Sequence, residues 1–428
     1  MSLPDRITEP LEDWVIEQRW FASKAREISA VNVLETIALS ESPKLDLLII
    51  EARFQAGTHE LYQLLPGDPE GVRVLAGLLG EEKHVECVSF HGGLTPTGDV
   101  RPMGAEQSNS SIVFGEEQVL KVFRRIEPGD NPELEMLRFL SRRGFANVAA
   151  LTGWYEYSGE LISATLGILQ EFVPESRDGW QLALEDPLGL LRRVGELGEA
   201  TARMHNILAS DATDPAFAPE EPSAEALSLL TATIDEQIEQ MFLDLPADER
   251  VAPIAGRGEE IRDRLQMLSH VGVGGRLIRN HGDYHLGQTM LAAGVGGGTE
   301  SRWIILDFEG EPARSLLDRR RKRSPLRDVA GMLRSFAYAA SASELLRGVP
   351  APDDWEERAR AVYLESYLDT VEPFLLPAGQ TAIEKLLAIF ELEKAVYELR
   401  YELNNRPDWV KIPVAGIGRL LEEEVQTP

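Results

Sequence analysis

One stretch of nine residues carries the densest set of side chains able to do chemistry. It starts at residue 280 and reads NHGDYHLGQ, so that the acid Asp283 is followed five residues later by the amide Gln288. This spacing is typical of phosphoryl transfer, in which a carboxylate accepts the proton of the attacking hydroxyl and an amide oxygen binds a hard cation. A second acid, Asp307, ends an apolar run nineteen residues after Gln288. The pattern predicts Asp283 as catalytic base, and Gln288 and Asp307 as ligands of Mg²⁺.

A lysine upstream is placed where it can hold a nucleotide. Lys121 is the central residue of the strand-like run VLKVF, and a helix is expected soon after it, from Asn131 to Arg143. In enzymes that transfer phosphoryl groups, such a lysine holds the α- and β-phosphates and pairs with a glutamate of the helix. The helix offers Glu133 and Glu135, and Glu135 is the preferred partner.

Two further segments complete the expected ATP site. Backbone N–H groups and hydroxyls of a small polar stretch before the lysine strand are expected to cover the phosphates. The residues assigned to this cover are Gln107, Ser108, Asn109 and Ser110. The segment LQEFVP is expected to form a hinge in which Glu171 and Val173 hold adenine through their backbone. Each of these motifs alone is a weak signal. Their order along the chain predicts an ATP-dependent phosphotransferase.

Several of these motifs resemble those of known enzymes. HGD…Q and DFE resemble the HRD…N and DFG signatures of protein kinases, and the chain resembles the aminoglycoside-phosphotransferase branch of the protein-kinase-like superfamily. The segments EQRWFASK, HGDYHLGQ, LDFEGEP and, above all, YELRYELNNRPDWVKIP resemble those of the maltokinases, including the maltokinase part of trehalose synthase fusions. General phosphotransferases lack the last of these segments.

The resemblance implies a reaction and a set of substrate contacts. The reaction is ATP-dependent phosphorylation of maltose at its anomeric hydroxyl, which gives maltose 1-phosphate and ADP and feeds α-glucan or glycogen synthesis from trehalose and maltose. The C-terminal segment is suited to a sugar because aromatic faces stack on sugar C–H surfaces and charged groups bind hydroxyls. The residues assigned to the substrate are His281, Tyr397, Tyr401, Glu402, Arg406 and Trp409.

Simpler structural explanations stand beside these assignments. A lysine in a strand is often a solvated edge residue, and Tyr397 and Tyr401, four residues apart, would share one helix face and pack against the C-terminal lobe. His281, Asp283 and His285 form an alternative zinc site of a hydrolase. However, all seven histidines lie at or before residue 285, so no downstream histidine completes that cluster.

Three functions remain open at this point. They are a maltokinase, a kinase of the same fold acting on another sugar, amino sugar or aminoglycoside, and a non-catalytic partner subunit of a trehalose synthase. The complete set of kinase-type residues argues against the last, although partner binding in addition to catalysis stays open. The basic run Arg319–Arg323 is either a solvated loop or a surface for docking or phosphate handling.

These side chains require two kinds of surrounding structure. We expect an α+β, bilobal, protein-kinase-like fold with an α/β cap over residues 1–90, a β-rich nucleotide lobe over 91–175 and a mainly helical lobe over 176–428. Strands are expected at 111–114 and 119–123, joined by a hairpin turn at Gly115-Glu116. Beyond Asp328 the apolar spacing is almost entirely helical.

Composition excludes several classes of protein. The 428 residues carry a net charge of −28, which disfavours nucleic acid and anionic membranes as partners. The single cysteine, Cys87, excludes an intrachain disulfide. The acidic N-terminal segment lacks the features of a signal peptide, and no apolar run approaches the roughly 18 residues of a transmembrane helix. We therefore expect a soluble, cytoplasmic protein.

Overall fold

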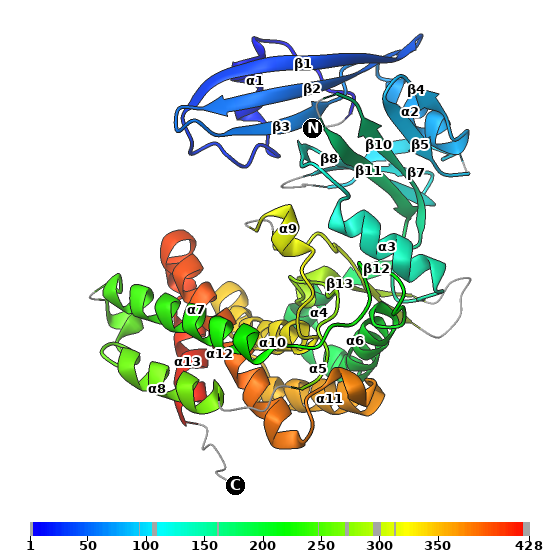
Figure 1. Cartoon of the computed structure of the whole chain (residues 1–428). Helices are drawn as coiled ribbons and strands as arrows, with labels where there is room; N and C mark the ends of the chain where they lie inside the picture. The colour runs from blue at the N-terminus through cyan, green and yellow to red at the C-terminus, as the bar shows by residue number, and fades with distance from the viewer. Residues whose placement is uncertain are drawn as a thin grey trace. The chain divides into compact units, whose positions relative to one another are not determined.

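The computed structural model describes residues 3–93, 95–104, 109–160, 162–246, 248–269, 274–293, 301–311 and 314–422. The chain divides into two compact units, residues 1–176 and 177–428 (Figure 1). The first unit is built on two antiparallel sheets, and the second is mainly helical.

A four-stranded sheet, with the order β1-β2-β3-β9, opens the first unit. Its strands are β1 (Ile28–Glu41), β2 (Lys44–Phe54), β3 (His59–Leu64) and β9 (Arg125–Ile126), and the short helix α1 (Leu11–Glu17) precedes them. Trp14, Val15, Trp20 and Phe21 pack against inward-facing residues of β2 and β3. An ion pair also holds the N-terminal segment in place. Arg124 donates two hydrogen bonds, of 2.6 and 2.9 Å, to the buried carboxylate of Asp5.

A seven-stranded sheet forms the rest of the first unit, with the order β4-β5-β10-β11-β8-β7-β6. Its strands are β4 (His84–Val85), β5 (Val88–His91), β6 (Val100–Pro102), β7 (Asn109–Phe114), β8 (Gln118–Phe123), β10 (Leu151–Ser158) and β11 (Ser163–Glu171). Helices α2 (Gly71–Gly80) and α3 (Pro132–Arg142) belong to the same unit. Gly115 and Glu116 both have positive φ, of 54° and 55°, so the expected hairpin between β7 and β8 is confirmed.

The expected boundary near residue 90 does not separate two bodies. Strand β5 pairs with β10 in the seven-stranded sheet, and the ring of Phe90 stacks on that of Tyr155 at 5.6 Å. One hydrophobic core joins residues of β1, β2 and α2 to residues of β7, β8, β10 and β11. The regions 1–90 and 91–175 therefore form a single unit, because β4 and β5, the last strands of the expected cap, lie at one edge of the seven-stranded sheet.

The second unit combines one small sheet with a set of helices. The sheet has the order β12-β13-β14, formed by β12 (Ser176–Asp178), β13 (Thr289–Ala292) and β14 (Arg302–Ile305). The helices are α4 (Gly179–Glu185), α5 (Pro187–Leu191), α6 (Val194–Leu208), α7 (Ala224–Leu243), α8 (Gly258–Ser269), α9 (Leu316–Arg319), α10 (Leu326–Arg347), α11 (Trp355–Thr370), α12 (Gln380–Asn405) and α13 (Lys411–Glu422). Helix α10 packs against α12, and α6 packs against α11.

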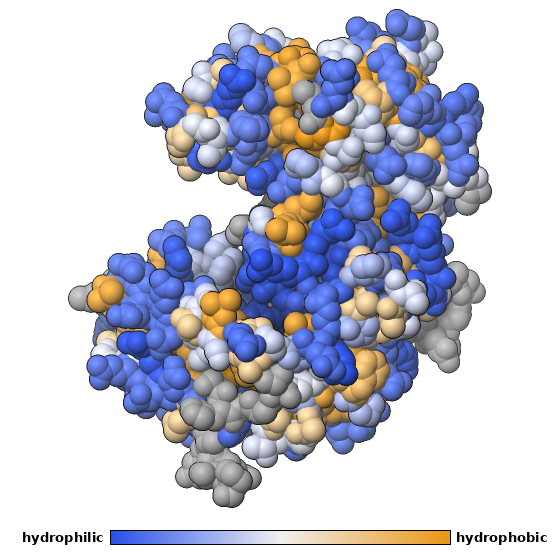
Figure 2. Space-filling view, viewed as in Figure 1, coloured by the Kyte–Doolittle hydropathy of each residue, from blue (hydrophilic) through white to orange (hydrophobic). Residues whose placement is uncertain are grey.

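On the face drawn in Figure 2, hydrophilic residues cover most of the surface, and hydrophobic residues gather most clearly on the first unit. Among the helices that the structure describes, none combines the length and the apolar character needed to cross a bilayer.

Candidate functional site

The loop His281–Asp283 is shaped by a glycine. Gly282 has φ +87°, a backbone conformation that residues other than glycine rarely adopt. A β-carbon at this position would lie 3.5 Å from the Cα of Gly310. The loop therefore passes directly beside the segment that follows Asp307. In this way the fold brings together the two motifs, HGD and DFE, that the sequence analysis assigned to one site.

A buried acid on α10 fixes the backbone of this loop. The carboxylate of Asp328 accepts hydrogen bonds from the backbone N–H groups of His281, at 2.8 Å, and Gly282, at 3.0 Å. His205 Nε2 lies 3.1 Å from the same carboxylate, and His205 Nδ1 lies 3.0 Å from the hydroxyl of Tyr367. Burial opposes the charge of Asp328, but these hydrogen bonds outweigh it and lower the pKa of the carboxyl.

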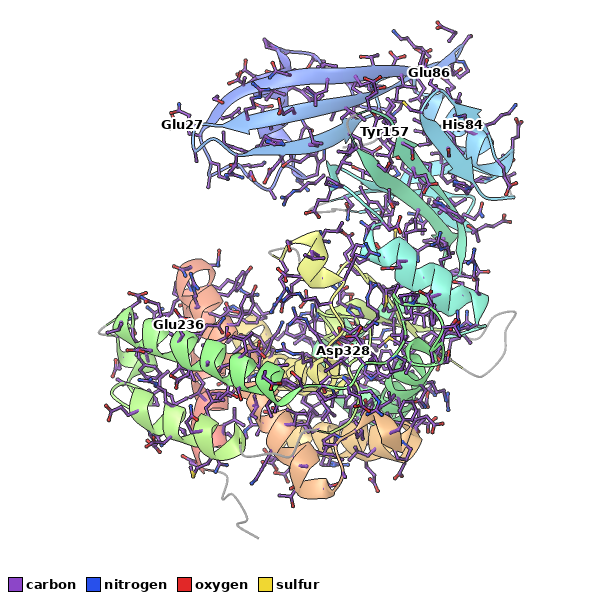
Figure 3. All side chains as sticks on the ribbon, viewed as in Figure 1. Glu27, His84, Glu86, Tyr157, Glu236 and Asp328 are labelled. Atoms are coloured by element: carbon purple, nitrogen blue, oxygen red, sulfur yellow. The ribbon has the colours of Figure 1, made fainter. Side chains whose placement is uncertain are left out.

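Asp328 lies in the interior of the helical unit (Figure 3), and the sequence analysis gave it no role. Its signal in the sequence was weak, because it is only an acid in the first turn of an apolar helix. Its function follows from contacts with residues 46 and 47 positions earlier in the chain.

His281 serves the interior of the loop, and this corrects its assignment to the substrate. Its side chain is buried, and its Nε2 lies 2.8 Å from the carbonyl oxygen of Leu306. The ring also packs against the rings of Tyr284 and Phe308, with centroid distances of 5.1 and 5.0 Å. His281 therefore connects the loop His281–Asp283 to the segment that follows β14, and its ring is buried within the fold.

Gln288 and Asp307 lie next to each other, as their predicted role requires. The side-chain N–H of Gln288 donates to Asp307 Oδ2 at 3.0 Å, and the backbone N–H of Leu306 donates to the Gln288 carbonyl at 2.9 Å. The antiparallel pair β13–β14 sets this proximity, because Thr289 lies opposite Ile305. Carboxylate and amide oxygens are the hard donors that Mg²⁺ prefers, so these two residues fit the ion. Asp307 itself has φ +60°, which is uncommon for a residue other than glycine.

A lysine that the sequence analysis did not assign lies beside the predicted base. Lys394 Nζ, from α12, is 3.3 Å from Asp283 Oδ1 and 3.5 Å from Glu311 Oε1. Burial by itself would lower the pKa of Lys394, but the carboxylates of Asp283 and Glu311 outweigh burial and raise it. The ammonium group is therefore charged. Its sequence signal was its position three residues before Tyr397, the first residue of the segment expected to bind sugar.

A pocket in the second unit opens onto Asp283 and Lys394. Tyr397 lines it too, with Lys394 Nζ 5.3 Å from the centre of the Tyr397 ring. Four arginines also line this pocket, two of them from the basic run that the sequence analysis singled out. They are Arg314, Arg319, Arg323 and Arg327.

The other predicted sugar contacts form a separate cluster. The buried carboxylate of Glu402 pairs with Arg406 at 2.6 Å, and the Arg406 guanidinium lies 4.6 Å from the centre of the Trp409 ring. Trp409 in turn stacks near Trp180 and Tyr338, with centroid distances of 6.5 and 6.3 Å. Within the described part of the chain, the pocket lining includes Tyr397 but not Tyr401, Glu402, Arg406 or Trp409.

The zinc alternative does not match the observed contacts. His281 Nε2 faces the Leu306 carbonyl, and His285 Nδ1 accepts a hydrogen bond from the N–H of Gly287 at 3.1 Å. Burial lowers the pKa of His285, which keeps its ring neutral. Among the residues that the structure describes, His281, Asp283 and His285 do not form a group of converging metal-ligand atoms.

In the first unit, Lys121 pairs with a glutamate of α3. Lys121 Nζ lies 2.7 Å from Glu133 Oε2, whereas Glu135 was the preferred partner. Glu133 lies in the first turn of α3, where the side chain of Asn131 accepts its backbone N–H at 2.8 Å. The start of this helix therefore places Glu133 at the lysine strand, and the pairing of Glu135 with Lys121 stays a prediction. Glu135 is buried in the same turn.

The remaining predicted nucleotide contacts are placed only in part. Gln107 and Ser108 lie outside the described residues. Asn109 and Ser110 begin β7 and lie opposite Phe123 and Val122 of β8. The Ser110 hydroxyl accepts a hydrogen bond from Arg124 at 2.8 Å. Glu171 ends β11 on the surface, and Val173 follows it closely. Their contacts with adenine and phosphate stay predictions.

Comparisons with known proteins bear on this arrangement. The profile of the phosphotransferase enzyme family matches residues 99–359, and that of the maltokinase N-terminal cap domain matches residues 14–68. A glucosamine kinase of Streptacidiphilus jiangxiensis is 26% identical over 84% of this chain and 83% of its own. A glucosamine kinase of Mycolicibacterium smegmatis is 25% identical over 85% of this chain and 90% of its own.

A solved structure of a glucosamine kinase in complex with glucosamine, ADP and inorganic phosphate is similar along 97% of this chain and 100% of that one, with a TM-score of 0.71 and 20% identity. The expected α+β, kinase-like fold is thereby confirmed. The matched family profile spans the lysine strand, the loop with Asp283, and strand β14 with Asp307 just after it. This chain belongs to the phosphotransferase enzyme family.

Proposed function

We propose that this protein is a sugar kinase that transfers the terminal phosphoryl group of ATP to the anomeric hydroxyl of maltose. The observation that carries the proposal is the pocket in which Asp283, Lys394 and Tyr397 lie together. The match of residues 14–68 to the maltokinase cap domain supports maltose as the acceptor. So does the C-terminal segment from Tyr397, on which the resemblance to maltokinases mainly rests.

The charge beside Asp283 also favours a neutral acceptor. The carboxylate of Asp283 is already paired with the Lys394 ammonium at 3.3 Å. A protonated amino sugar that approached this carboxylate would compete with Lys394 and would meet like charge. A neutral disaccharide needs only hydrogen bonds and a ring on which to stack, and Tyr397 offers such a ring.

In the proposed mechanism, Asp283 accepts the proton of the sugar hydroxyl as that oxygen attacks phosphorus. Asp328 and His281 hold the loop, so the base is presented in a fixed position. Lys394 orients Asp283 and lines the same pocket. Fixing the reacting groups in this way supplies much of the rate, because phosphoryl transfer needs little covalent chemistry from the protein.

Each unit contributes its own residues to the handling of the nucleotide. Lys121, held by Glu133, would bind the nucleotide phosphates, while Gln288 and Asp307 would hold Mg²⁺. When bound, the ion neutralises charge on the phosphates. A place in α-glucan synthesis, a trehalose synthase partner and a cytoplasmic location remain parts of this proposal that rest on the resemblance alone.

Glucosamine is the second candidate acceptor. The two curated relatives with 26% and 25% identity are both glucosamine kinases. In that case Glu311, which shares Lys394 with Asp283, offers a carboxylate for the amino group.

The test is an ADP-release assay of the purified chain with ATP, Mg²⁺ and one acceptor at a time: maltose, glucose, glucosamine or an aminoglycoside. We expect the highest kcat/KM with maltose, and we expect the product to lose its reducing end. A preference for glucosamine would replace maltose by the second candidate. Absence of ADP release with every acceptor would contradict a sugar kinase.

A further inference from the structure

The pocket beside Asp283 is lined by four arginines that the proposed mechanism does not use, and Arg323 is one of them. Arg323 is the last residue of the basic run, and its side chain lines the pocket. Its backbone is fixed by a bridge to Ile278, with N–H···O distances of 2.8 and 2.9 Å. Its guanidinium donates a hydrogen bond to a backbone carbonyl, that of Asp318, at 3.4 Å. Within the described residues, no carboxylate lies at ion-pair distance from Arg323.

The acids of the pocket are all engaged by other groups. Glu311 pairs with Arg314 and with Lys394, and Glu393 pairs with Arg327 at 2.8 Å. These pairs place the guanidinium groups of Arg314 and Arg327 in the same pocket as that of Arg323.

The other three acids of the lining are occupied as well. Asp283 pairs with Lys394, and Asp328 accepts the backbone N–H groups of the catalytic loop. Asp318 accepts a hydrogen bond from Ser315 and lies 3.5 Å from Arg321. No acid of the lining is therefore left to neutralise Arg323.

The electrostatic consequence is that, among the described residues, Arg323 has no ion pair of its own beside two other guanidinium groups. Burial, together with the like charges of Arg327 and Arg314, lowers the pKa of Arg323 to about 10. The guanidinium groups of Arg314 and Arg327 are paired with Glu311 and Glu393, whereas that of Arg323 is paired with no acid in the described part of the chain. Like charges in one pocket repel one another, and an anion bound among them relieves this repulsion. Guanidinium groups bind tetrahedral oxyanions through paired N–H groups, and phosphate is the ligand that matches this geometry best.

We infer that Arg323, with Arg314 and Arg327, forms an oxyanion subsite that binds a phosphate group in the pocket next to Asp283. Two sources share this chemistry. One is the phosphate ester of the phosphorylated sugar, which forms at the hydroxyl that Asp283 deprotonates and thus in the same pocket. The other is free inorganic phosphate. The first source rests on the proposed function, and the second does not.

Titration of inorganic phosphate into the full-length protein, without nucleotide or Mg²⁺, tests the subsite by calorimetry. We expect Arg323→Gln to weaken phosphate binding by about tenfold or more, the loss expected for a charge-assisted pair. The matched control is Arg321→Gln, in the same basic run, since the Arg321 side chain is 65% exposed and lies outside the pocket lining. It should bind phosphate as the wild type does.

Melting temperature separates a binding role from a structural one. Removal of an unneutralised cation should leave the melting temperature of Arg323→Gln unchanged or raise it, whereas loss of a structural arginine would lower it. No binding of phosphate to the wild type, or equal weakening by Arg323→Gln and Arg321→Gln, would overturn the inference.

Competition distinguishes the two sources. Displacement of phosphate from the wild type by maltose 1-phosphate, but not by maltose, would support the sugar phosphate as the ligand. Phosphate binding that maltose 1-phosphate leaves unchanged would support free phosphate and overturn the first source. These binding measurements do not depend on turnover. A negative ADP-release assay would therefore contradict the proposed function but not the oxyanion subsite.

Discussion

Among the candidate site residues, each unit of the molecule contributes a lysine–carboxylate pair, and the two pairs are built differently. Lys121 and Glu133 lie 2.7 Å apart, with 17% and 3% of their side chains exposed. Lys394 and Asp283 lie 3.3 Å apart, with 26% and 25% exposed. The first pair is closed and shielded, as suits a cation that is held in place to receive phosphates. The second is looser and accessible, as suits an acid that must release its partner's hydrogen bond to take a proton.

Removal of the acid of the looser pair should have the largest effect. We expect Asp283→Asn to lower kcat by about a thousandfold, because a positioned general base contributes about two to four orders of magnitude. ATP binding, measured by calorimetry, should stay as in the wild type. The exposed acid Asp369 provides the control, since Asp369→Asn changes the same charge on the surface of α11. Substantial turnover by Asp283→Asn would assign the base elsewhere.

Removal of the lysine of the closed pair should act on the nucleotide. Lys121→Met is expected to raise the KM for ATP and lower kcat, by roughly ten- to a hundredfold in kcat/KM, since it deletes a charge-assisted bond to phosphate and leaves Glu133 buried without that partner. Steady-state kinetics with varied ATP measures this. Lys83→Met, at an exposed lysine of the same unit, is the matched variant that should leave both constants unchanged. An unchanged KM for ATP would remove Lys121 from the nucleotide site.

Removal of the lysine of the looser pair should act on the acceptor instead. We expect Lys394→Met to raise the KM for the sugar by about tenfold and to leave the KM for ATP unchanged, because Lys394 lines the pocket with Asp283. Kinetics with each substrate varied in turn gives both constants. If Lys394→Met and Lys121→Met changed the same constant, the distinction between the two pairs would fail.

The smallest effect concerns pH and His285, which lies close to the looser pair. Burial lowers the pKa of His285, so the unfolded chain binds this proton more readily than the folded one. The free energy of unfolding should therefore fall as the pH drops through the ordinary pKa of histidine, 6.5. In His285→Asn, urea midpoints between pH 7.5 and 5.5 should change less than in the wild type. The exposed His59 serves as control, and His59→Asn should keep the wild-type slope.

Local sequence signals predicted much of the fold and part of the site. The Gly-Glu turn between β7 and β8, the cap of α3 at Asn131, and the strand just before Asp307 follow from residue types within a few positions. The adjacency of Gln288 and Asp307 follows from the hairpin-like pairing of β13 with β14.

The rest depends on contacts between distant segments. Lys394 reaches Asp283 across 111 positions, and Asp328 reaches the catalytic loop from another helix. No local pattern distinguishes such residues from ordinary charged side chains of a helix. Glu133 and Glu135 share one helical turn, so composition alone could not choose between them. Hydropathy also could not reveal that His281 is buried rather than facing the substrate.

The positive φ of Asp307 limits what mutagenesis at this position can report. An alanine there would be forced into a backbone conformation that its β-carbon disfavours, so Asp307→Ala would mix a conformational penalty with the loss of a ligand. Asparagine tolerates the left-handed region well and keeps a carbonyl oxygen where the carboxylate had one. Asp307→Asn is thus the substitution from which the contribution of charge can be extracted, and an alanine scan of this protein would overstate it.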